Sequence, residues 1–167
     1  FQLANAYSNL AVSRLNKASR EADEQQAEEL RREADEQFRK AAELFKDAGG
    51  STDLLEIKVL SQYRLIKALF QAQDFQGVIT AAIKLIEEYP QSDYVDEALY
   101  EMGWAYFNLG EFPQAIRAFE QLAERNSADY RIDRAQFQIG KSYFEQEKYP
   151  EAREALALLK NGISSVR

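Results

Sequence analysis

The stretch LYEMGWAYFNLGEFPQAIRAFEQL, residues 99–122, predicts two helices joined by a short turn. Its apolar residues recur three or four positions apart, which is typical of a helix and not of a strand. Between the two runs, Gly110 suits the left-handed residue that ends a helix, and Pro113 suits the first turn of the next one. So short a connection makes the two helices antiparallel neighbours in an αα-hairpin. Gly103 and Ala115 have little side chain, so the helices can approach closely.

The same hairpin recurs along the chain at a step of 37 residues. Shifting the sequence by 37 positions places Gly103 on Gly140 and Tyr106 on Tyr143. Three consecutive copies cover residues 54–160. Self-similarity at a fixed period is the signature of a repeat architecture, in which each unit buries its apolar face against its neighbours.

Some copies depart from the pattern. The first copy has Ile66 where the next two have glycine, and Val78 and Ala82 at later key positions. The last copy has Glu147 where Gly110 stood. These departures bear on the local geometry of the copies and leave the predicted fold unchanged.

A divergent hairpin precedes the three copies, with helices expected over residues 3–17 and 21–48. The early part of the second helix, residues 20–36, is highly charged, and we expect it to project into solvent. Its carboxylates could hold Ca²⁺, but interleaved Arg and Lys residues would pair with them at i,i+4, which favours a solvated face. The residues Asp53-Leu54-Leu55-Glu56 that follow resemble a capping box.

We expect one domain over residues 1–167, with hairpins at about 1–50, 53–90, 92–127 and 129–162, the last two joined by a linker at 126–129. The chain begins at Phe1 without a starter Met or a signal segment, so it is expected to be a piece of a longer protein. The ends of a stack of hairpins expose an apolar face unless something covers them. More repeats, a partner or self-association through the ends is therefore expected beyond Ile163.

The composition excludes several classes of function. A net charge of −7 disfavours nucleic acid, because binding to phosphate needs a basic surface. The absence of Cys and His removes thiol nucleophiles, Ser-His triads and zinc sites. No phosphate loop or nucleophile elbow is present, so no enzyme activity, cofactor or metal is expected. Uncharged stretches stay below the roughly 18 apolar residues of a membrane span, so no direct membrane insertion is expected.

The hairpin pattern resembles the signature of the tetratricopeptide repeat (TPR) family, carried here by Leu99, Gly103, Tyr106, Gly110, Phe112, Ala115, Phe119 and Leu122. The resemblance implies an all-α fold, a right-handed superhelix of about four hairpins, and a non-enzymatic scaffold. The 37-residue step is longer than the roughly 34 residues of the standard repeat. The linker at 89–98 is similar to that of bacterial envelope members such as the assembly lipoprotein BamD and the periplasmic Tol-Pal-associated protein, which implies a periplasmic or envelope location.

The first helix of each copy carries aromatic ladders at the 37-residue step. Spacings of three and four place them on one helical face, away from the face that packs inside the hairpin. In a solenoid this face lines the concave side, where an extended peptide or an amphipathic helix of a partner would bind. The alternative is that the rings pack between repeats. The predicted partner-binding residues are Tyr63, Lys67, Phe70, Tyr100, Trp104, Phe107, Phe137, Lys141 and Phe144.

These features together predict a bacterial scaffold that binds a protein partner on its concave face. Two other hypotheses stay open from the sequence. The chain could be a structural or self-associating module, or it could be an accessory domain of a larger enzyme or regulator whose chemistry lies outside these residues.

Overall fold

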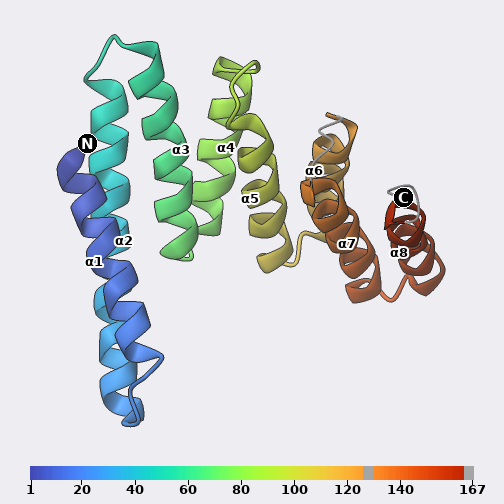
Figure 1. Ribbon diagram of the computed structural model, residues 1–167, viewed down its shortest axis with the longest axis horizontal. Coiled ribbons are helices and arrows are strands. Elements are labelled where there is room, and N and C mark those ends of the chain that lie inside the picture. The colour runs from blue at the N-terminus through green and yellow to red at the C-terminus, as the bar shows by residue number, and fades with distance from the viewer. Residues whose placement is uncertain (126–129, 164–167) are drawn as a thin grey trace. The chain divides into compact units, whose positions relative to one another are not determined.

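The computed structural model describes residues 1–125 and 130–163, with the backbone alone at 130–132 and 160–163, and these residues form eight helices and no strand (Figure 1). The predicted all-α fold is therefore confirmed. The predicted linker at 126–129 lies outside the described residues. The helices are α1 (Gln2–Ala18), α2 (Glu24–Gly50), α3 (Leu55–Gln71), α4 (Phe75–Glu88), α5 (Val95–Asn108), α6 (Phe112–Glu124), α7 (Tyr130–Glu145) and α8 (Tyr149–Ile163).

The helices divide into two compact units, and each helix packs on its sequence neighbours within its unit. The first unit, Phe1–Tyr94, holds α1 to α4, where α2 contacts α1 and α3, and α3 contacts α4. The second unit starts at Val95 and holds α5 to α8, again packed in chain order. That all the hairpins form one domain stays a prediction. None of the described helices combines the length and hydrophobicity needed to cross a bilayer.

The turn inside the hairpin has the same backbone geometry in three copies. The φ angle is positive at Gln73 (56°), Gly110 (75°) and Glu147 (60°), which lie one 37-residue step apart. At each turn, the N–H of this residue donates to the carbonyl three residues back, and the next N–H donates to the carbonyl five back, at N···O distances of 2.9 to 3.0 Å. This is the Schellman motif that ends many helices. The left-handed end predicted at Gly110 is confirmed, and the same turn forms where glycine is absent.

Replacing Gln73 by glycine should stabilise the protein by up to about 1 kcal/mol, because a side chain at positive φ costs roughly 1–2 kcal/mol and glycine's greater freedom in the unfolded chain offsets part of that. Urea unfolding followed by circular dichroism measures the change. The control is Gln121→Gly in the last turn of α6, which should destabilise by up to about 1 kcal/mol. A loss at Gln73 equal to the loss at Gln121 would contradict the interpretation.

Inside the hairpin of the second unit, the backbone of Gly103 on α5 lies against the ring of Phe119 on α6. A Cβ atom added at Gly103 would lie 2.6 Å from Cε1 of Phe119, whose side chain is fully buried. One step along, a Cβ atom at Gly140 would lie 2.6 Å from Cγ of Leu156. Glycine is therefore required at this position for a different reason from the predicted close approach of the two helices: a large side chain of the second helix occupies the space that a Cβ atom would need.

The first copy reverses this pairing of small and large residues. At the positions equivalent to Gly103 and Phe119 it carries Ile66 and Ala82, both completely buried. The large side chain has moved from the second helix to the first, so the interior of the hairpin stays filled. Close-packed interiors require such compensation, since a void or an overlap at one position is costly.

Gly103→Ala should destabilise the protein by about 1 kcal/mol, because overpacking costs roughly 1–3 kcal/mol and alanine's better helix propensity returns about 1 kcal/mol. Adding Phe119→Leu should restore part of the loss, so the two changes would not be additive. Chemical unfolding of the single and double variants measures the coupling. Gly50→Ala is the control, since no atom lies within 4 Å of a Cβ atom there. Additive losses would refute the contact.

The divergent first hairpin differs from the prediction that residues 20–36 project into solvent. Ala27 and Ala34 on the early half of α2 are buried, and Ala34 joins Ala11 of α1 and Phe38 of α2 in one apolar cluster. Arg14 of α1 also forms an ion pair with Glu33 of α2. In Figure 1 the α1–α2 hairpin extends past the end of α3. The early half of α2 is therefore one side of a hairpin, because α1 covers its alanine face and only the charged face meets solvent.

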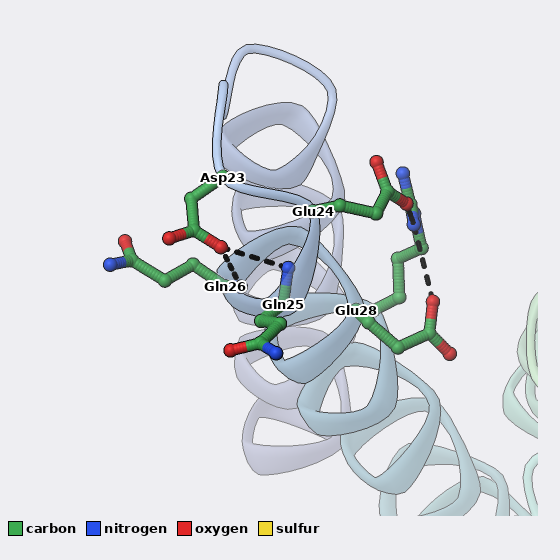
Figure 2. Close-up of polar contacts among 6 residues, drawn as sticks. Asp23, Glu24, Gln25, Gln26 and Glu28 are labelled. Carbon is green, nitrogen blue, oxygen red and sulfur yellow. Dashed lines mark hydrogen bonds and ion pairs between the residues drawn. The ribbon is translucent and has the colours of Figure 1, made fainter.

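The start of α2 shows how that charged face is organised (Figure 2). The carboxylate of Asp23 accepts hydrogen bonds from the backbone N–H groups of Gln25 at 2.9 Å and Gln26 at 3.2 Å, which caps the helix. Arg31 bridges Glu24 at 2.9 Å and Glu28 at 3.2 Å, and hydrogen bonds to both carboxylates raise the pKa of Arg31. These pairs are at i,i+7 and i,i+3 and not at the predicted i,i+4. Glu24 and Glu28 are thereby each paired with a cationic side chain.

The capping box predicted at residues 53–56 does not form. The N-cap of α3 is Leu54, with no side-chain hydrogen bond to the helix, and its own N–H donates to Oγ1 of Thr52 at 3.2 Å. Leu54 and Leu55 are 63% and 62% exposed at the start of α3. In a capping box, the side chain of the fourth residue accepts a hydrogen bond from the N–H of the N-cap residue. Here the N–H of the N-cap Leu54 donates to the side chain of Thr52.

Candidate partner-binding face

Three aromatic side chains of α5 form a continuous, half-buried row. Tyr100 and Trp104 meet edge to face with ring centroids 6.5 Å apart, and Trp104 and Phe107 do so at 5.6 Å. Spacings of four and three residues place the three rings on one side of the helix, as predicted. The Tyr100 ring also lies 5.9 Å from that of Phe119, so the row rests on the buried contact between α5 and α6.

Lys141 joins this row to α7. Its Nζ lies 4.6 Å from the ring centroid of Phe107 and 5.6 Å from that of Trp104, within the range of a cation–π interaction. On the same side of α7, Phe137 is 50% exposed and Phe144 is 58% exposed. The structure therefore brings the six predicted residues of the second unit onto two neighbouring helices. We call this set the aromatic face: Tyr100, Trp104, Phe107, Phe137, Lys141 and Phe144.

The other three predicted residues lie on α3 in the first unit, and all three are half-buried. The Tyr63 ring stacks on that of Tyr94, with centroids 4.5 Å apart and planes 16° from parallel. Tyr94 belongs to the linker after α4 and was not among the predicted residues. No repeat signal could have found it, since the positions one step away are Ile57 and Arg131.

The ladder of Phe70, Phe107 and Phe144 packs within each hairpin. Each ring meets the aromatic residue that starts the next helix, edge to face, with centroids 5.3 to 5.8 Å apart. The alternative considered from the sequence was packing between repeats, whereas these ring contacts lie across the hairpin turn within one repeat. In the last copy both rings, Phe144 and Tyr149, remain more than half exposed. The pairs are Phe70–Phe75, Phe107–Phe112 and Phe144–Tyr149.

No group of Asp and Glu side chains in the described ranges is arranged to hold a metal ion. Burial raises the pKa of Tyr143, with Glu120, Glu151 and Glu154 adding to the effect, and burial likewise raises the pKa of Tyr89 beside Glu88. Both hydroxyls therefore stay protonated at neutral pH and act as neutral hydrogen-bonding groups.

Comparison with known proteins supports the resemblance to the TPR family. Residues 100–165 match a family model described as tetratricopeptide repeat. No curated protein sequence gives a significant match. Two crystal structures of a Podosopora anserina protein described as a kinesin light chain, with nearly identical TPR-like repeats, share the fold. One, a single-residue variant, is 18% identical with a TM-score of 0.63 and covers 96% of this chain and 78% of that chain. The other is 16% identical with a TM-score of 0.60 and covers 85% and 71%.

The fold is therefore all-α, built from helical hairpins of the TPR type. The family match extends from α5 through α8 and includes the whole aromatic face. Neither comparison supports the expected bacterial or envelope setting, and at this level of identity the two structures inform the fold alone.

Lys141→Ala should uncover the Trp104 ring and raise the constant for acrylamide quenching of its fluorescence, because the lysine side chain lies over it. Trp104 is the sole tryptophan of the sequence, so the signal has one source. We also expect a loss of stability of about 0.5–1 kcal/mol from the cation–π contact. The control is Lys148→Ala in the α7–α8 turn, whose Nζ bonds to Gln146. Equal quenching in the parent and in Lys141→Ala would rule out the contact.

Proposed function

We propose that this protein is a non-enzymatic TPR scaffold that binds a peptide or helix of a partner protein through the aromatic face. Support comes from the TPR match over residues 100–165 and from the shared fold, since stacked helical hairpins commonly present extended concave binding surfaces. On this proposal, Tyr63, Lys67 and Phe70 of α3 also take part in binding, because they occupy the same repeat positions as Tyr100, Trp104 and Phe107.

The observation that carries the proposal is the position of Lys141 over Trp104 and Phe107, beside the exposed ring of Phe137. The Lys141 ammonium and the edge-to-face contacts between the rings fix the side chains of the aromatic face, so little side-chain freedom is lost when a partner binds. Contiguous apolar patches on a protein surface often mark interaction sites, and aromatic side chains contribute much of the binding energy at many interfaces.

The chemistry of the face suits an apolar side chain that inserts between the rings. An amphipathic helix or an extended peptide presents such side chains at regular spacing, and each binds by covering an aromatic surface. The ammonium of Lys141 adds a donor for a carbonyl or a carboxylate of the partner. The identity of the partner does not follow from these residues.

We also propose a location in the bacterial cell envelope, and this part of the proposal is supported only by the resemblance of one linker. The residues 89–98 are similar to the linker of bacterial envelope TPR proteins. Detection of the full-length gene product in a periplasmic extract would support this setting. Its recovery in the cytoplasmic fraction alone would refute it and leave the binding role untouched.

Trp104→Ala should weaken partner binding by about tenfold or more, since a central interface tryptophan commonly contributes 2 kcal/mol or more. Peptide ligands would be selected from a random display library by binding to the unmodified chain. The selected peptides would then be synthesised and titrated by calorimetry. Leu10→Ala on α1, which removes a 45% exposed leucine elsewhere, should leave the affinity unchanged. If the selected peptides bind Trp104→Ala and the parent equally, the aromatic face is not the binding site.

Self-association and an accessory role in a larger enzyme stay open as alternatives. Multi-angle light scattering separates the first from partner binding, because a mass that rises with concentration would show association between copies. The accessory role would depend on residues outside this sequence, so its test is an activity assay on the full-length gene product.

A further inference from the structure

The start of α3 exposes apolar side chains that the hairpin does not use. Leu54, Leu55 and Ile57 are 63%, 62% and 37% exposed. Ser, Thr, Asp and Asn are preferred at an N-cap because their side chains accept a hydrogen bond from the first turn of the helix. The leucine at the N-cap of α3 has no such acceptor. Clustered exposed apolar residues on a soluble protein often mark a contact surface.

Beside these leucines lies a hollow of about 720 Å³ with mostly apolar walls. One side comes from the first two turns of α3, with Leu55, Val59 and Leu60. The other side comes from the linker after α4, with Tyr89, Pro90 and Tyr94. Its volume is within the roughly 300–1,000 Å³ of pockets that take small ligands or a few side chains. We call it the α3 hollow.

The linker wall of the α3 hollow is held in place by its own contacts. The N–H of Ser92 donates to the carbonyl of Tyr89 at 2.9 Å, and the N–H of Tyr94 donates to Oγ of Ser92 at 3.1 Å. The Tyr94 ring then stacks on Tyr63 of α3, which ties the linker to the helix opposite. A wall fixed in this way is formed before any ligand arrives, which lowers the entropic cost of binding.

The charged residues that line the α3 hollow are all acidic: Glu56, Glu88 and Asp93. Glu88 has one cation, Lys84, at 3.9 Å, and both side chains are about half exposed, so this pair contributes little. Glu56 and Asp93 form no ion pair with any residue whose side chain the structure describes. The apolar floor thus has a negative rim, which attracts a basic segment and repels an acidic one.

We propose that the α3 hollow binds a segment of a partner protein in which one or two large apolar side chains are flanked by Lys or Arg. The apolar side chains cover Leu55 and Val59, and the flanking cations meet the carboxylates of Glu56 and Asp93. A second copy of this chain is a poor occupant, because each copy carries a net charge of −7. The site lies in the first unit and does not depend on the aromatic face of the second.

The probe is a fluorescein-labelled peptide with a central Leu-Phe pair flanked by two lysines on each side, titrated with the 167-residue chain and followed by anisotropy. We expect binding that weakens with salt, and no binding of the same peptide with glutamates in place of lysines. Leu55→Ala should weaken binding about five- to tenfold through lost apolar contact. Leu3→Ala, which removes another leucine that is 59% exposed, should not.

The charge test pairs two double variants of equal net charge. Glu56→Gln with Asp93→Asn should weaken binding and reduce its salt dependence, whereas Glu29→Gln with Glu36→Gln on α2 should change neither. Equal losses in the two pairs would mean general attraction to an acidic chain and would overturn the proposal. Binding that survives Leu55→Ala unchanged would overturn it as well.

A last arm separates this site from the aromatic face and from self-association. Trp104→Ala should leave the affinity for the lysine peptide unchanged, and loss in that variant alone would place the peptide on the aromatic face and refute the α3 hollow. A dimer in light scattering that Leu55→Ala dissociates would show that a second copy fills the hollow, which would also refute the basic partner segment.

Discussion

The contact between the backbone of Gly103 and the ring of Phe119 is the constraint on which the second unit depends. Because no side chain stands at Gly103, the ring fills the space between α5 and α6 and is completely buried. The same ring supports Tyr100, which meets Trp104, which in turn meets Phe107. A row of contacts therefore runs from the most buried point of the hairpin to its surface. The geometry of the aromatic face follows from the packing beneath it.

The 37-residue register explains why so much could be predicted from the sequence. A fixed period carries both the apolar face and the turn, so the helices of the three copies and the left-handed residue at Gly110 follow from one alignment of the chain on itself. The six residues of the aromatic face share the same register, and the structure places them on α5 and α7 with Lys141 over two rings. The features that recur at the 37-residue step could therefore be predicted from the sequence.

Features that do not recur at the 37-residue step were not predicted from the sequence. The stack of Tyr63 on Tyr94 joins a helix to a linker, and its partner positions one step away are not aromatic. The early half of α2 was expected to be solvated because its charged residues outnumber its apolar ones, yet its buried residues Ala27 and Ala34 lie on a face that α1 covers. The capping box failed because a short motif describes side chains that could bond, and the bond went to Thr52. Each of these depends on a neighbour that local sequence does not specify.

The positive φ angles at Gln73 and Glu147 have a consequence for how such chains are recognised. The hairpin turn is determined by a pair of backbone hydrogen bonds, and glycine makes it easier without being required. A copy can therefore drift away from the glycines of its family while its two helices stay in place. The family match begins at residue 100, although a hairpin with the same turn is complete before it. Counting repeats by sequence signature thus gives a lower bound on the length of an array, and backbone geometry gives the fuller count.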